Sequence, residues 1–529
     1  MDTKEILKFC MENGLLLDKD VLGLFQEVGD VESIKLIINK MKGHTHQKII
    51  TKTLFEENKE KVNKFFLELP KENQKSLEVL KIKLGLSIEI SREKEIVKET
   101  KDGESGLNNF EVGKVKVLTD PSPVGKKFEV LDFVHYFRAR FNELKKILEQ
   151  HSKLDNLVSI GKFSGNRQGV SIIGLVSSKR VTKNNNILLG VEDFTGKINV
   201  LINNNKPELH KIAEDITLDS VLGFRGSGSK EIFFVNEVVF PEAFLHERKR
   251  SPVEEYALFT GDLHFGSKRF LKEGFNKFLD YLGGNVPNTP EVEKIKYLFL
   301  GGDVVTGVGN YPNQEKDLEI KDIEEQFLAL SELLKKIKRG INIIISPGNH
   351  DGVRLMEPQP FFDEKYAWPL YDLKNVILTT NPATVNIGAK NNFSGFDVLN
   401  YHGFSFPYYA NNIPSLAKTN SMNSPEKIME YLLKNRHLAP THGSVQYYPS
   451  KKDFHLIKGV PDVFFACHTH KSAVSYFNNV LVISSSCWEA LTPYQEKFGN
   501  TPDHCKVPML NLKTRAVKIL DFEGDEEEK

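Results

Sequence analysis

Five apolar runs, each followed at once by a polar group rich in Asp, Asn and His, constrain the fold of this chain more than any other feature. They read YALFT before GDLHFGS, KYLFL before GGDVVTG, INIIIS before PGNHDG, VLNY before HGFSF, and VFFA before CHTHKS. Segments of helical periodicity near 269–282 and 321–338 alternate with the runs, which is typical of buried strands with helices between them. Because binding sites of open α/β sheets lie beyond the carboxyl ends of the strands, the polar groups are expected to converge.

The first polar group can be interpreted as a turn or as part of a metal site. Asp262 and His264 are two residues apart, and alternate residues of a strand point to the same face, so both could reach one ion. Asp and Gly also favour turns for local reasons, and GDLHFGS alone is more simply a turn. The recurrence of such groups at five strand ends favours the metal site. The candidate residues are Asp262, His264, Asp303, Asn349, His350, Asp351, His402, His468 and His470.

The order DLH, GGD, GNHD, YHG and CHTH resembles the calcineurin-like metallophosphoesterase superfamily, in which DxH, GD, GNHD, H and GHTH follow one another. Cys467 departs from this pattern, since the family usually has Gly there, and a bulkier residue could tighten the local turn. The resemblance implies that His350 is not a ligand and faces the substrate phosphate and the leaving oxygen. It implies one metal on Asp262, His264, Asp303 and His470, and a second on Asp303, Asn349, His402 and His468, with Asp303 bridging.

Phosphodiester hydrolysis suits these residue types. Two divalent ions about 3.5–4 Å apart supply a nucleophile and clamp the phosphoryl oxygens, and only two carboxylates among the ligands leave a net positive charge for a diester. Mixed nitrogen and oxygen ligands favour manganese, with iron, zinc and magnesium as alternatives. His350 would act as general acid or electrostatic stabiliser, and Asp351 would either orient an imidazole or cap a turn. Ligand histidines must be neutral, so activity is expected to fall at low pH.

Composition limits the other classes of function. The 529 residues contain 71 basic and 71 acidic side chains, so any nucleic-acid surface must be local. The cysteines form no CxxC pair, which argues against a zinc ribbon or a disulfide framework. The N-terminus shows no signal peptide, and no stretch approaches the roughly 20 apolar residues of a spanning helix. We therefore expect a soluble, cytoplasmic protein without membrane contact.

The sequence pattern changes character along the chain and suggests several domains. Residues 1–85 have helical periodicity and predict a small N-terminal module that docks a partner or caps the chain. Residues 86–130 are charged and poor in large apolar groups, which indicates a flexible linker. Residues 131–245 begin with an amphipathic helix and continue into short strands, and residues 250–529 carry the α/β pattern.

The short strands between residues 157 and 240 indicate a small barrel of the oligonucleotide-binding (OB) type. Such barrels bind single strands through basic and aromatic side chains. The candidates here are Lys179, Arg180, Lys183 and Arg225, and a solvated barrel edge with ordinary charges is the alternative. The expected fold is therefore multidomain: an α/β metallophosphoesterase domain, in which helices flank a β-sandwich, preceded by an OB-type β-barrel and a small helical N-terminal domain.

Taken together, this domain order resembles the small subunits of archaeal family-D DNA polymerases. The stretches NRHLAPTHG (435–443) and SSSCWEALTPYQEKFGNTPDHCKVPMLNL (484–512) are similar to the C-terminal part of that family. The resemblance implies a 3′–5′ exonuclease that proofreads primer ends as part of a DNA-directed DNA polymerase. It implies a stable complex with a large catalytic subunit, binding of single-stranded DNA and primer 3′ ends, and contact with a sliding clamp through that complex.

Three other functions remain as alternatives: a structural polymerase subunit with a vestigial site, a repair nuclease of the same superfamily, and a phosphatase of proteins or small molecules. A repair nuclease usually begins with the phosphoesterase domain, and a phosphatase would leave the barrel unexplained. The complete ligand set argues against a vestigial site. Outside the site, His437, His442 and His455 are expected to be structural or surface residues, and Trp488 and Tyr494 either stack on a base or pack.

Overall fold

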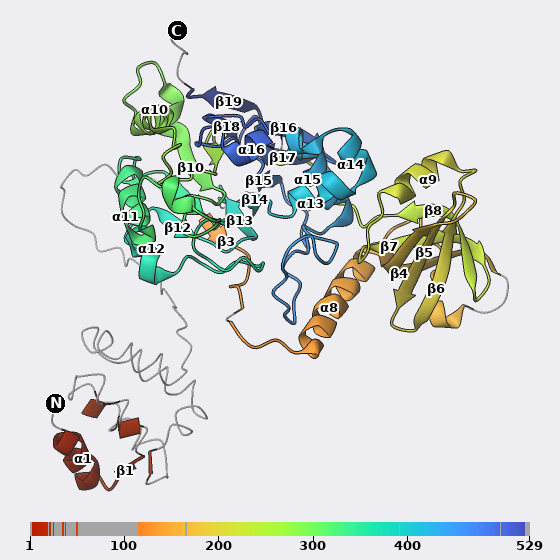
Figure 1. Ribbon diagram of the computed structural model, residues 1–529, viewed down its shortest axis with the longest axis horizontal. Helices are drawn as coiled ribbons and strands as arrows, with labels where there is room; N and C mark the ends of the chain where they lie inside the picture. The colour runs from red at the N-terminus through yellow and green to blue at the C-terminus, as the bar shows by residue number, and fades with distance from the viewer. Residues whose placement is uncertain are drawn as a thin grey trace. The chain divides into compact units, whose positions relative to one another are not determined.

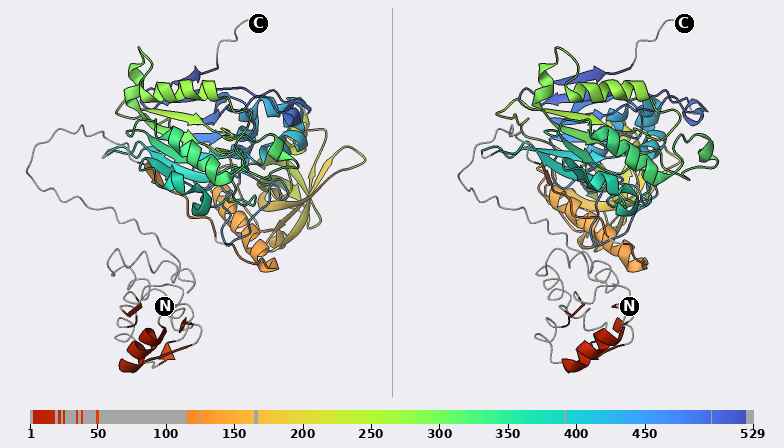
Figure 2. Two further views of the ribbon diagram at one scale, coloured as in Figure 1. Left: turned by 60° about the vertical axis from the view of Figure 1, so that its left-hand side comes forward. Right: turned by 90° about the vertical axis from the view of Figure 1, so that its left-hand side faces the viewer.

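The structure is a computed structural model (Figures 1 and 2) that divides into two compact units, residues 1–107 and 108–529. It describes residues 115–523 except 124, 164–166, 391 and 498, together with residues 3–18, 21, 22, 25, 34, 35, 38, 49 and 50. In the first unit, helix α1 (Thr3–Glu12) buries Ile6 and Cys10, and β1 (Leu16–Leu17) pairs in parallel with β2 (Ile49–Ile50). The rest of the predicted helical module, and residues 86–114 of the predicted linker, lie outside the described residues.

The second unit contains a six-stranded sheet, counted over its described residues, whose strand order is β12-β11-β10-β9-β18-β19. The first four of these strands are parallel, and β18 and β19 extend the sheet in antiparallel pairs. Three of the five polar groups singled out in the sequence follow β9, β10 and β11. The strands are β9 (Tyr256–Thr260), β10 (Ile295–Leu300), β11 (Asn342–Ile345), β12 (Val376–Leu378), β18 (Lys506–Asn511) and β19 (Val517–Asp521).

A second sheet, also of six strands within the described part, has the order β16-β17-β15-β14-β13-β3. Strands β14, β15 and β17 are parallel, and the remaining polar groups follow β14 and β15. Both sheets therefore direct polar loops toward one edge. The strands are β3 (Val115–Val117), β13 (Ala383–Ile387), β14 (Phe396–Tyr401), β15 (Val463–Ala466), β16 (Ala473–Phe477) and β17 (Val480–Ser484).

The two sheets pack face to face, and helices cover both outer faces. Alternate residues of one strand serve the two faces, as the pleat requires: Phe259 lies between the sheets, and Leu258 packs against the outer helices. Helices α10 (Lys272–Gly283), α11 (Ile323–Leu334) and α12 (Glu364–Tyr371) cover the first sheet. The second sheet is covered by α13 (Phe406–Asn412) and α15 (Pro425–Asn435), with α14 (Pro414–Lys418) beside them.

Local capping explains where several of these helices begin and end. The Asp322 side chain accepts hydrogen bonds from Glu324 N and Glu325 N at 2.9 and 3.1 Å and so begins α11. Helix α10 ends at Gly284, whose φ of 75° suits a residue without a Cβ. The remaining short elements are α16 (Pro493–Lys497), η1 (Ile160–Lys162), η2 (Pro290–Lys294), η3 (Gln314–Lys316) and η4 (Ser421–Asn423).

A closed barrel with strand order β4-β5-β6-β8-β7 occupies the region where the sequence predicted an OB-type barrel. Its interior is apolar, with Ile172, Val200 and Phe224 fully buried. Helix α9 (Pro207–Glu214) connects β6 with β7. The strands are β4 (Arg167–Val181), β5 (Ile187–Asp193), β6 (Gly196–Ile202), β7 (Val221–Gly228) and β8 (Ile232–Val239).

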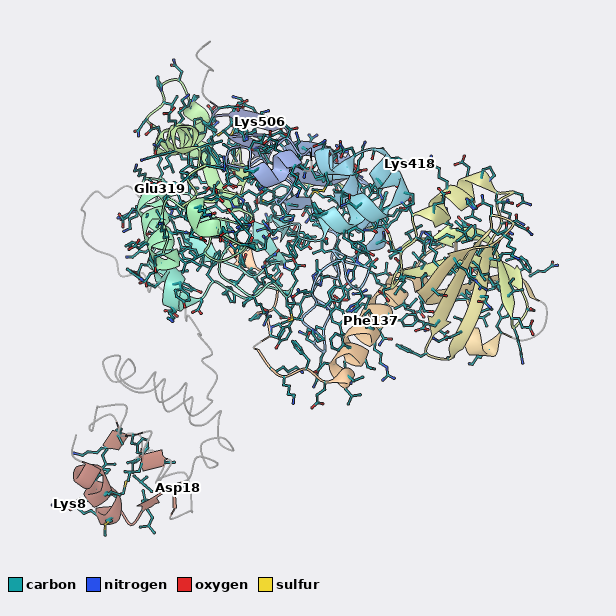
Figure 3. All side chains as sticks on the ribbon, viewed as in Figure 1. Lys8, Asp18, Phe137, Glu319, Lys418 and Lys506 are labelled. Carbon is teal, nitrogen blue, oxygen red and sulfur yellow. The ribbon has the colours of Figure 1, made fainter. Side chains whose placement is uncertain are left out.

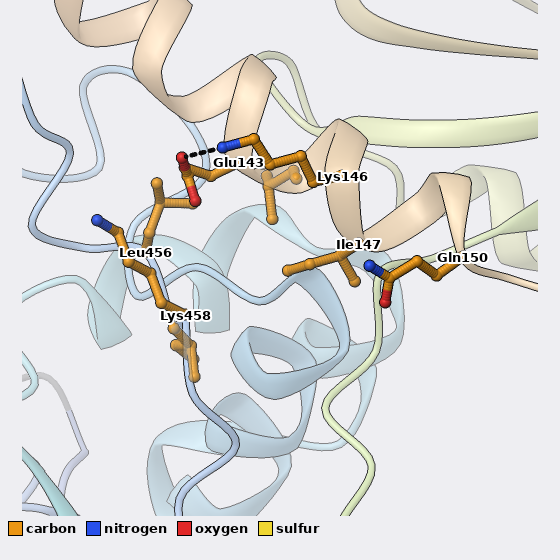
Figure 4. Close-up of a pocket in the computed structure, with 8 residues that line it drawn as sticks. Glu143, Lys146, Ile147, Gln150, Leu456 and Lys458 are labelled. Carbon is orange, nitrogen blue, oxygen red and sulfur yellow. Dashed lines mark hydrogen bonds and ion pairs between the residues drawn. The ribbon is translucent and has the colours of Figure 1, made fainter.

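Helix α8 (Val130–Glu149) joins the barrel to the two-sheet domain (Figure 1). Phe141 and Leu144 pack with barrel residues, and Tyr136 packs with the loop that follows α15. Toward its C-terminal end, α8 borders a cleft of about 110 Å³ in which Ile147 faces Leu456 and Lys458 of that loop (Figure 4). The helix therefore contacts both domains and does not belong to the barrel alone.

The C-terminal part of the predicted linker is ordered. Strand β3 pairs antiparallel with β13 at the edge of the second sheet, and Val115 and Val117 pack against the core between the sheets. Farther along, Arg354 donates to Ser122 Oγ at 2.6 Å and to Pro123 O at 3.0 Å. The linker expected over 86–130 therefore stops before residue 115, because two valines on one face of a short strand bury enough apolar surface to order it.

Candidate metal centre

The structure brings the predicted ligand residues together at the carboxyl ends of five strands. Five of them lie at positive φ, a conformation that costs a residue with a side chain about 1–3 kcal/mol. Strained backbone gathers at functional sites, and here the strained residues belong to three separate loops, which follow β9, β10 and β15. The φ angles are 47° for Asp262, 46° for His264, 48° for Asp303, 71° for His468 and 57° for His470.

Two glycines allow these loops to approach each other closely. A Cβ on Gly302 would lie 2.6 Å from His402 Nδ1, and a Cβ on Gly348 would lie 2.2 Å from Asp303 Oδ1. Such distances are too short for any side chain. The GGD and GNHD motifs therefore place backbone, and not side chains, next to the polar cluster.

The first group of donors consists of Asp262, His264 and His470, whose ligand atoms lie within 4.8 Å of one another. His264 Nε2 is 3.2 Å from His470 Nε2, and His470 Nε2 is 3.9 Å from Asp262 Oδ1. Asp262 is fully buried, and its Oδ1 atom has no hydrogen-bond partner. A buried carboxylate oxygen without a donor is costly, and a cation between these three side chains would satisfy it.

The second group surrounds Asp303, His402 and His468. His402 Nε2 lies 3.3 Å from Asp303 Oδ2, 3.3 Å from His468 Nδ1 and 3.0 Å from Asn349 Oδ1. Asp303 Oδ2 is also 3.9 Å from His264 Nε2, so one carboxylate borders both groups. The two carboxylates, four imidazoles and one amide oxygen are donors that suit a pair of divalent transition metals.

The electrostatics of the imidazoles fit metal ligation. Burial lowers the pKa of His264 to about 3, and burial likewise lowers the pKa of His468 and His470 well below the usual value. These three rings are neutral at pH 7, as a ligand must be. For Asp303, burial raises the pKa, but the neighbouring His402 and His350 outweigh it and hold the pKa well below its usual range.

His402 behaves differently from the other imidazoles because it faces the Asp303 carboxylate. Burial lowers its pKa, but Asp303 outweighs the burial and raises the pKa to about 10. The ring nitrogen Nδ1 lies 3.0 Å from Gly301 O, which fixes the ring with Nε2 toward the cluster. Without an ion, a proton on Nε2 therefore sits next to the carboxylate that a metal would bind.

His350 is held at the solvent-accessible rim of the cluster. Its backbone N–H donates to Asp303 Oδ1 at 2.8 Å, and its Nδ1 lies 3.0 Å from Thr306 O. Because a carbonyl oxygen only accepts, Nδ1 carries hydrogen and Nε2 is directed elsewhere. His350 also forms a third group of potential metal donors with His264 and Asp303. Its position alone is therefore compatible with the role of a metal ligand as well as with that of a general acid.

Asp351 caps the loops and does not orient an imidazole. Its carboxylate accepts hydrogen bonds from Val305 N at 3.0 Å and from Gly348 N at 2.7 Å. These bonds tie the loop after β10 to the loop after β11. Of the two roles predicted for Asp351, the structure shows the capping role.

Several residues at the cluster had no recognisable signal in the sequence. The Gln495 amide nitrogen lies 2.9 Å from His470 Nδ1, and Asn310 Nδ2 lies 3.1 Å from His350 Nδ1. The ring of Phe404 meets the ring of His468 edge to face, with centroids 5.4 Å apart. Single Gln, Asn and Phe residues belong to no motif spacing, so only the tertiary structure reveals them.

The Cys467 thiol fills space left by two glycines. A Cβ on Gly261 would lie 2.5 Å from Cys467 Sγ, and a Cβ on Gly301 would lie 2.3 Å from it. Cys467 is fully buried and accepts a hydrogen bond from Ser485 Oγ. The sequence predicted that Cys467 could tighten the turn; the glycines at the ends of β9 and β10 leave the space that its side chain needs.

The other singled-out residues lie outside the cluster. His437 and His455 are buried around Asp453, in agreement with a structural role, and His442 is exposed. Trp488 is fully buried and donates to Thr260 Oγ1 at 2.8 Å, so it packs and does not stack on a base. The side chain of Tyr494 lies outside the described residues.

The basic barrel residues differ in their availability. Lys179 Nζ donates to Glu214 O at 2.5 Å and to Ile216 O at 2.8 Å, and burial lowers its pKa. It therefore anchors the end of α9 and is not free to contact a phosphate. Arg225 pairs with Asp155 at 3.2 Å, whereas Arg180 and Lys183 remain at the barrel surface.

Residues 257–472 match the calcineurin-like phosphoesterase family, and this stretch contains every candidate metal ligand. The DNA polymerase II small subunit of Pyrococcus horikoshii is 36% identical over 86% of this chain and 73% of its own length. The chain belongs to the family of DNA polymerase II small subunits. The subunit of Methanothermobacter thermautotrophicus is 34% identical over 74% of this chain and 80% of its own length. The subunit of Pyrococcus furiosus is 38% identical over 76% of this chain, and the match spans 65% of that relative.

Membership of this family confirms the resemblance inferred from the motif order and the domain order. The phosphoesterase domain implies divalent metal ions, and the donor groups described above lie within it. In the part of the chain that the structure describes, no helix is both long and apolar enough to cross a membrane.

Proposed function

We propose that this chain is the exonuclease-bearing small subunit of a replicative DNA polymerase, and that it removes nucleotides from the 3′ ends of primers. The observation that carries the proposal is the convergence of Asp262, Asp303 and the facing imidazoles into two adjoining donor groups. A structural subunit would have no need to keep strained backbone and a buried carboxylate oxygen without a hydrogen-bond partner in this arrangement. The polarity of cleavage and the proofreading role rest on the family resemblance.

The residues divide the chemistry between them. Asp262, His264 and His470 would hold one divalent ion, Asn349, His402 and His468 would hold another, and Asp303 would serve both. Two such ions supply a nucleophile at neutral pH and neutralise charge on the phosphoryl group. Manganese is our first choice, with iron, zinc and magnesium as alternatives.

His350 would give a proton to the departing 3′-oxygen of the penultimate nucleotide. It is partly exposed, as Asn349 and His468 are, and its Nδ1 atom lies 3.0 Å from Thr306 O, which fixes the ring. General acids of this kind contribute on the order of 10²–10⁴ in rate.

The barrel and the large subunit complete the proposal. A closed barrel of short strands is the architecture of OB-type domains, which bind single strands without strong sequence preference. We propose that this barrel binds the unpaired primer end and that a large catalytic subunit carries the polymerase activity. Contact with a sliding clamp would come through the assembled complex.

A ladder assay tests the reaction. The purified chain with Mn²⁺ is given 5′-labelled single-stranded DNA and a mismatched primer–template, and stepwise shortening from the 3′ end is expected. Asp303→Asn and His350→Ala should each abolish or strongly reduce the ladder. Asp280→Asn and His246→Ala, which change exposed residues of the same types, should leave it intact.

The same assay discriminates the alternatives. Metal-replete protein that cleaves nothing, alone and with its large subunit, would establish a structural subunit with a vestigial site. Endonucleolytic products from hairpin or duplex substrates would instead point to a repair nuclease. Hydrolysis of phosphomonoesters without any DNA ladder would indicate a phosphatase.

A further inference from the structure

An aromatic surface leads away from the metal centre and is not explained by the ligand set. It begins at Phe404, which comes two residues after His402 in the chain. The ring of Phe404 is partly exposed and lies against the ring of His468. Phe404 and Phe137 of α8 both pack on a buried patch that includes Tyr136 and Tyr447. The rim of the metal centre is thus continuous with α8, where Figure 3 marks Phe137.

On α8 the rings continue at helical spacing. Phe133, Phe137 and Phe141 are four residues apart, so they lie along one side of the helix and rise about 6 Å at each step. Phe133 and Phe137 are partly exposed, and their rings lie 6.5 and 6.1 Å from the exposed ring of His442. The rings of Phe133 and Phe137 are therefore neither buried in a core nor fully exposed to solvent.

The far end of the surface reaches the barrel. The ring of Phe141 lies 4.8 Å from the ring of Phe194, which sits on the turn between β5 and β6 and is 57% exposed. The guanidinium of Arg138 lies 5.9 Å from the centroid of the same ring. An exposed Phe next to a cation, on the surface of a single-strand-binding architecture, is suited to stack a base and hold a phosphate.

The turn that presents Phe194 is fixed. Asp193 accepts hydrogen bonds from Thr195 N at 2.7 Å, Gly196 N at 3.0 Å and Ile160 N at 2.9 Å. The Thr195 hydroxyl donates to the same carboxylate, which therefore accepts four hydrogen bonds in all. Phe194 is therefore held exposed by a rigid turn, so that it cannot fold back to bury itself, and little ordering entropy is lost when a ligand binds.

The charges along the surface permit a polyanion. Between Asp132 and Glu143, α8 carries no carboxylate. The carboxylates that border the surface are engaged: Asp132 pairs with Lys126, Asp193 caps its turn, and Asp219 accepts from His442 N at 2.9 Å. Among the residues that the structure describes, Arg138 has no carboxylate partner within ion-pair distance and remains available as a cation.

We propose that Phe404, Phe137, Phe133 and Phe194 form a stacking path along which unpaired bases of single-stranded DNA pass between the barrel and the metal centre. The inference rests on the exonuclease function proposed above and names the residues that would guide its substrate. The occupant is a single strand and not a protein, because the path begins at Phe404, beside the candidate ligand His468, and ends on the barrel. Bases also stack on separate rings without needing a continuous apolar groove.

Binding measured without cleavage tests the path. Fluorescence anisotropy of labelled oligothymidine is recorded with the full-length chain in EDTA, so that catalysis plays no part. Phe194→Ala and Phe137→Leu should each weaken binding on the order of 5- to 100-fold, the range for loss of one base stack. Phe234→Ala is the matched control, since Phe234 is 46% exposed on β8 and has no place in the path.

A second readout reports stacking itself. With 2-aminopurine at the 3′ end of the oligonucleotide, the wild type should quench the fluorescence, and Phe404→Leu should relieve part of the quenching. Leucine retains most of the packing against Tyr136 and Tyr447, and circular dichroism of each variant establishes that it is folded.

The outcomes separate this inference from the exonuclease proposal. Unchanged DNA affinity in Phe194→Ala and Phe137→Leu overturns the path, as does a wild type that binds no single strand. Unchanged DNA affinity together with lost binding of the large subunit would assign the surface to a protein interface and also overturn it. If the wild type cuts no DNA while the variants still lose DNA affinity, the exonuclease proposal fails and the path stands.

Discussion

The Arg140 side chain of α8 donates from Nε to Asp453 Oδ2 at 2.8 Å, and both side chains are fully excluded from solvent. Asp453 belongs to the loop that follows α15, so the pair fastens α8 to the phosphoesterase domain. Arg140 also donates to Pro440 O, and His437 Nε2 lies 2.8 Å from Asp453 Oδ2. Burying two charges is costly, and this network offsets the cost by giving each charge several partners.

Replacing Arg140 by Met should destabilise the protein by roughly 3–5 kcal/mol, because it leaves the Asp453 carboxylate buried without its cation. The free energy of unfolding from urea titration measures the effect. Arg225→Met is the matched control: Arg225 pairs with Asp155 at 3.2 Å, but the two side chains are 40% and 56% exposed. That exposed pair should contribute at most about 1 kcal/mol. Equal losses in the two variants would show that burial of the Arg140 pair is unimportant.

His437 makes stability depend on pH. Burial and the nearby Arg140 lower its pKa to about 3, whereas an unfolded chain takes up this proton near pH 6.5. Below pH 6.5 the unfolded state therefore binds more protons than the folded state, and the free energy of unfolding falls as pH decreases toward 3. Asp453, whose pKa is held well below its usual range by His437 and Arg140 against the effect of burial, adds to the loss below about pH 4.

Urea unfolding of the wild type and of His437→Gln at pH 7, 6 and 5 checks this expectation. Glutamine can still donate to Asp453 but does not titrate, so the variant should lose less stability between pH 7 and pH 5. Asp453, Arg140 and His455 surround the ring and are unchanged in the variant. Parallel pH profiles for the two proteins would mean that His437 is not the titrating group.

The Cys467 thiol and the glycine at position 261 form a steric pair. Gly261→Ala would bring a Cβ within 2.5 Å of Cys467 Sγ, so we expect a loss of about 1–3 kcal/mol from overpacking. Cys467→Ala in the same chain removes the sulfur and should recover part of that loss. Thermal melts of the two single variants and the double variant give the coupling energy, and simple additivity would contradict a direct clash.

The sequence predicts those features of the site that depend on residues close together in the chain, and it misses those that depend on residues far apart in the chain. The strand ends at Asp262, Asp303 and His402 were predictable, because an apolar run and the residue that follows it are neighbours in the chain. The partners of Lys179 were not predictable, since two backbone carbonyls at the end of α9 carry no sequence signal. Strand β3 escaped notice because it is three residues long and is stabilised by a sheet edge formed some 270 residues later.

The predicted domain organisation of residues 131–245 was likewise right where it depended on local pattern and incomplete where it depended on tertiary contacts. Short β-type runs separated by turn residues predicted the barrel strands, and the structure has a closed barrel there. The sequence placed α8 with the barrel, because its amphipathic pattern gives one apolar side and does not say which neighbour covers it. Tyr136 and Arg140 are buried against the phosphoesterase domain, a contact that only tertiary structure could reveal.

The His402–Asp303 pair predicts how metal binding depends on pH. In the metal-free protein Asp303 raises the pKa of His402 to about 10, so below that pH an incoming divalent ion must displace one proton from the ring. Apparent Mn²⁺ affinity should therefore rise about tenfold for each pH unit between 6 and 8. Isothermal titration calorimetry in buffers of different ionisation enthalpy measures both the affinity and the number of protons released. Asp303→Asn removes the carboxylate that holds the proton and should weaken Mn²⁺ binding, and a pH-independent affinity in the wild type would refute the competition.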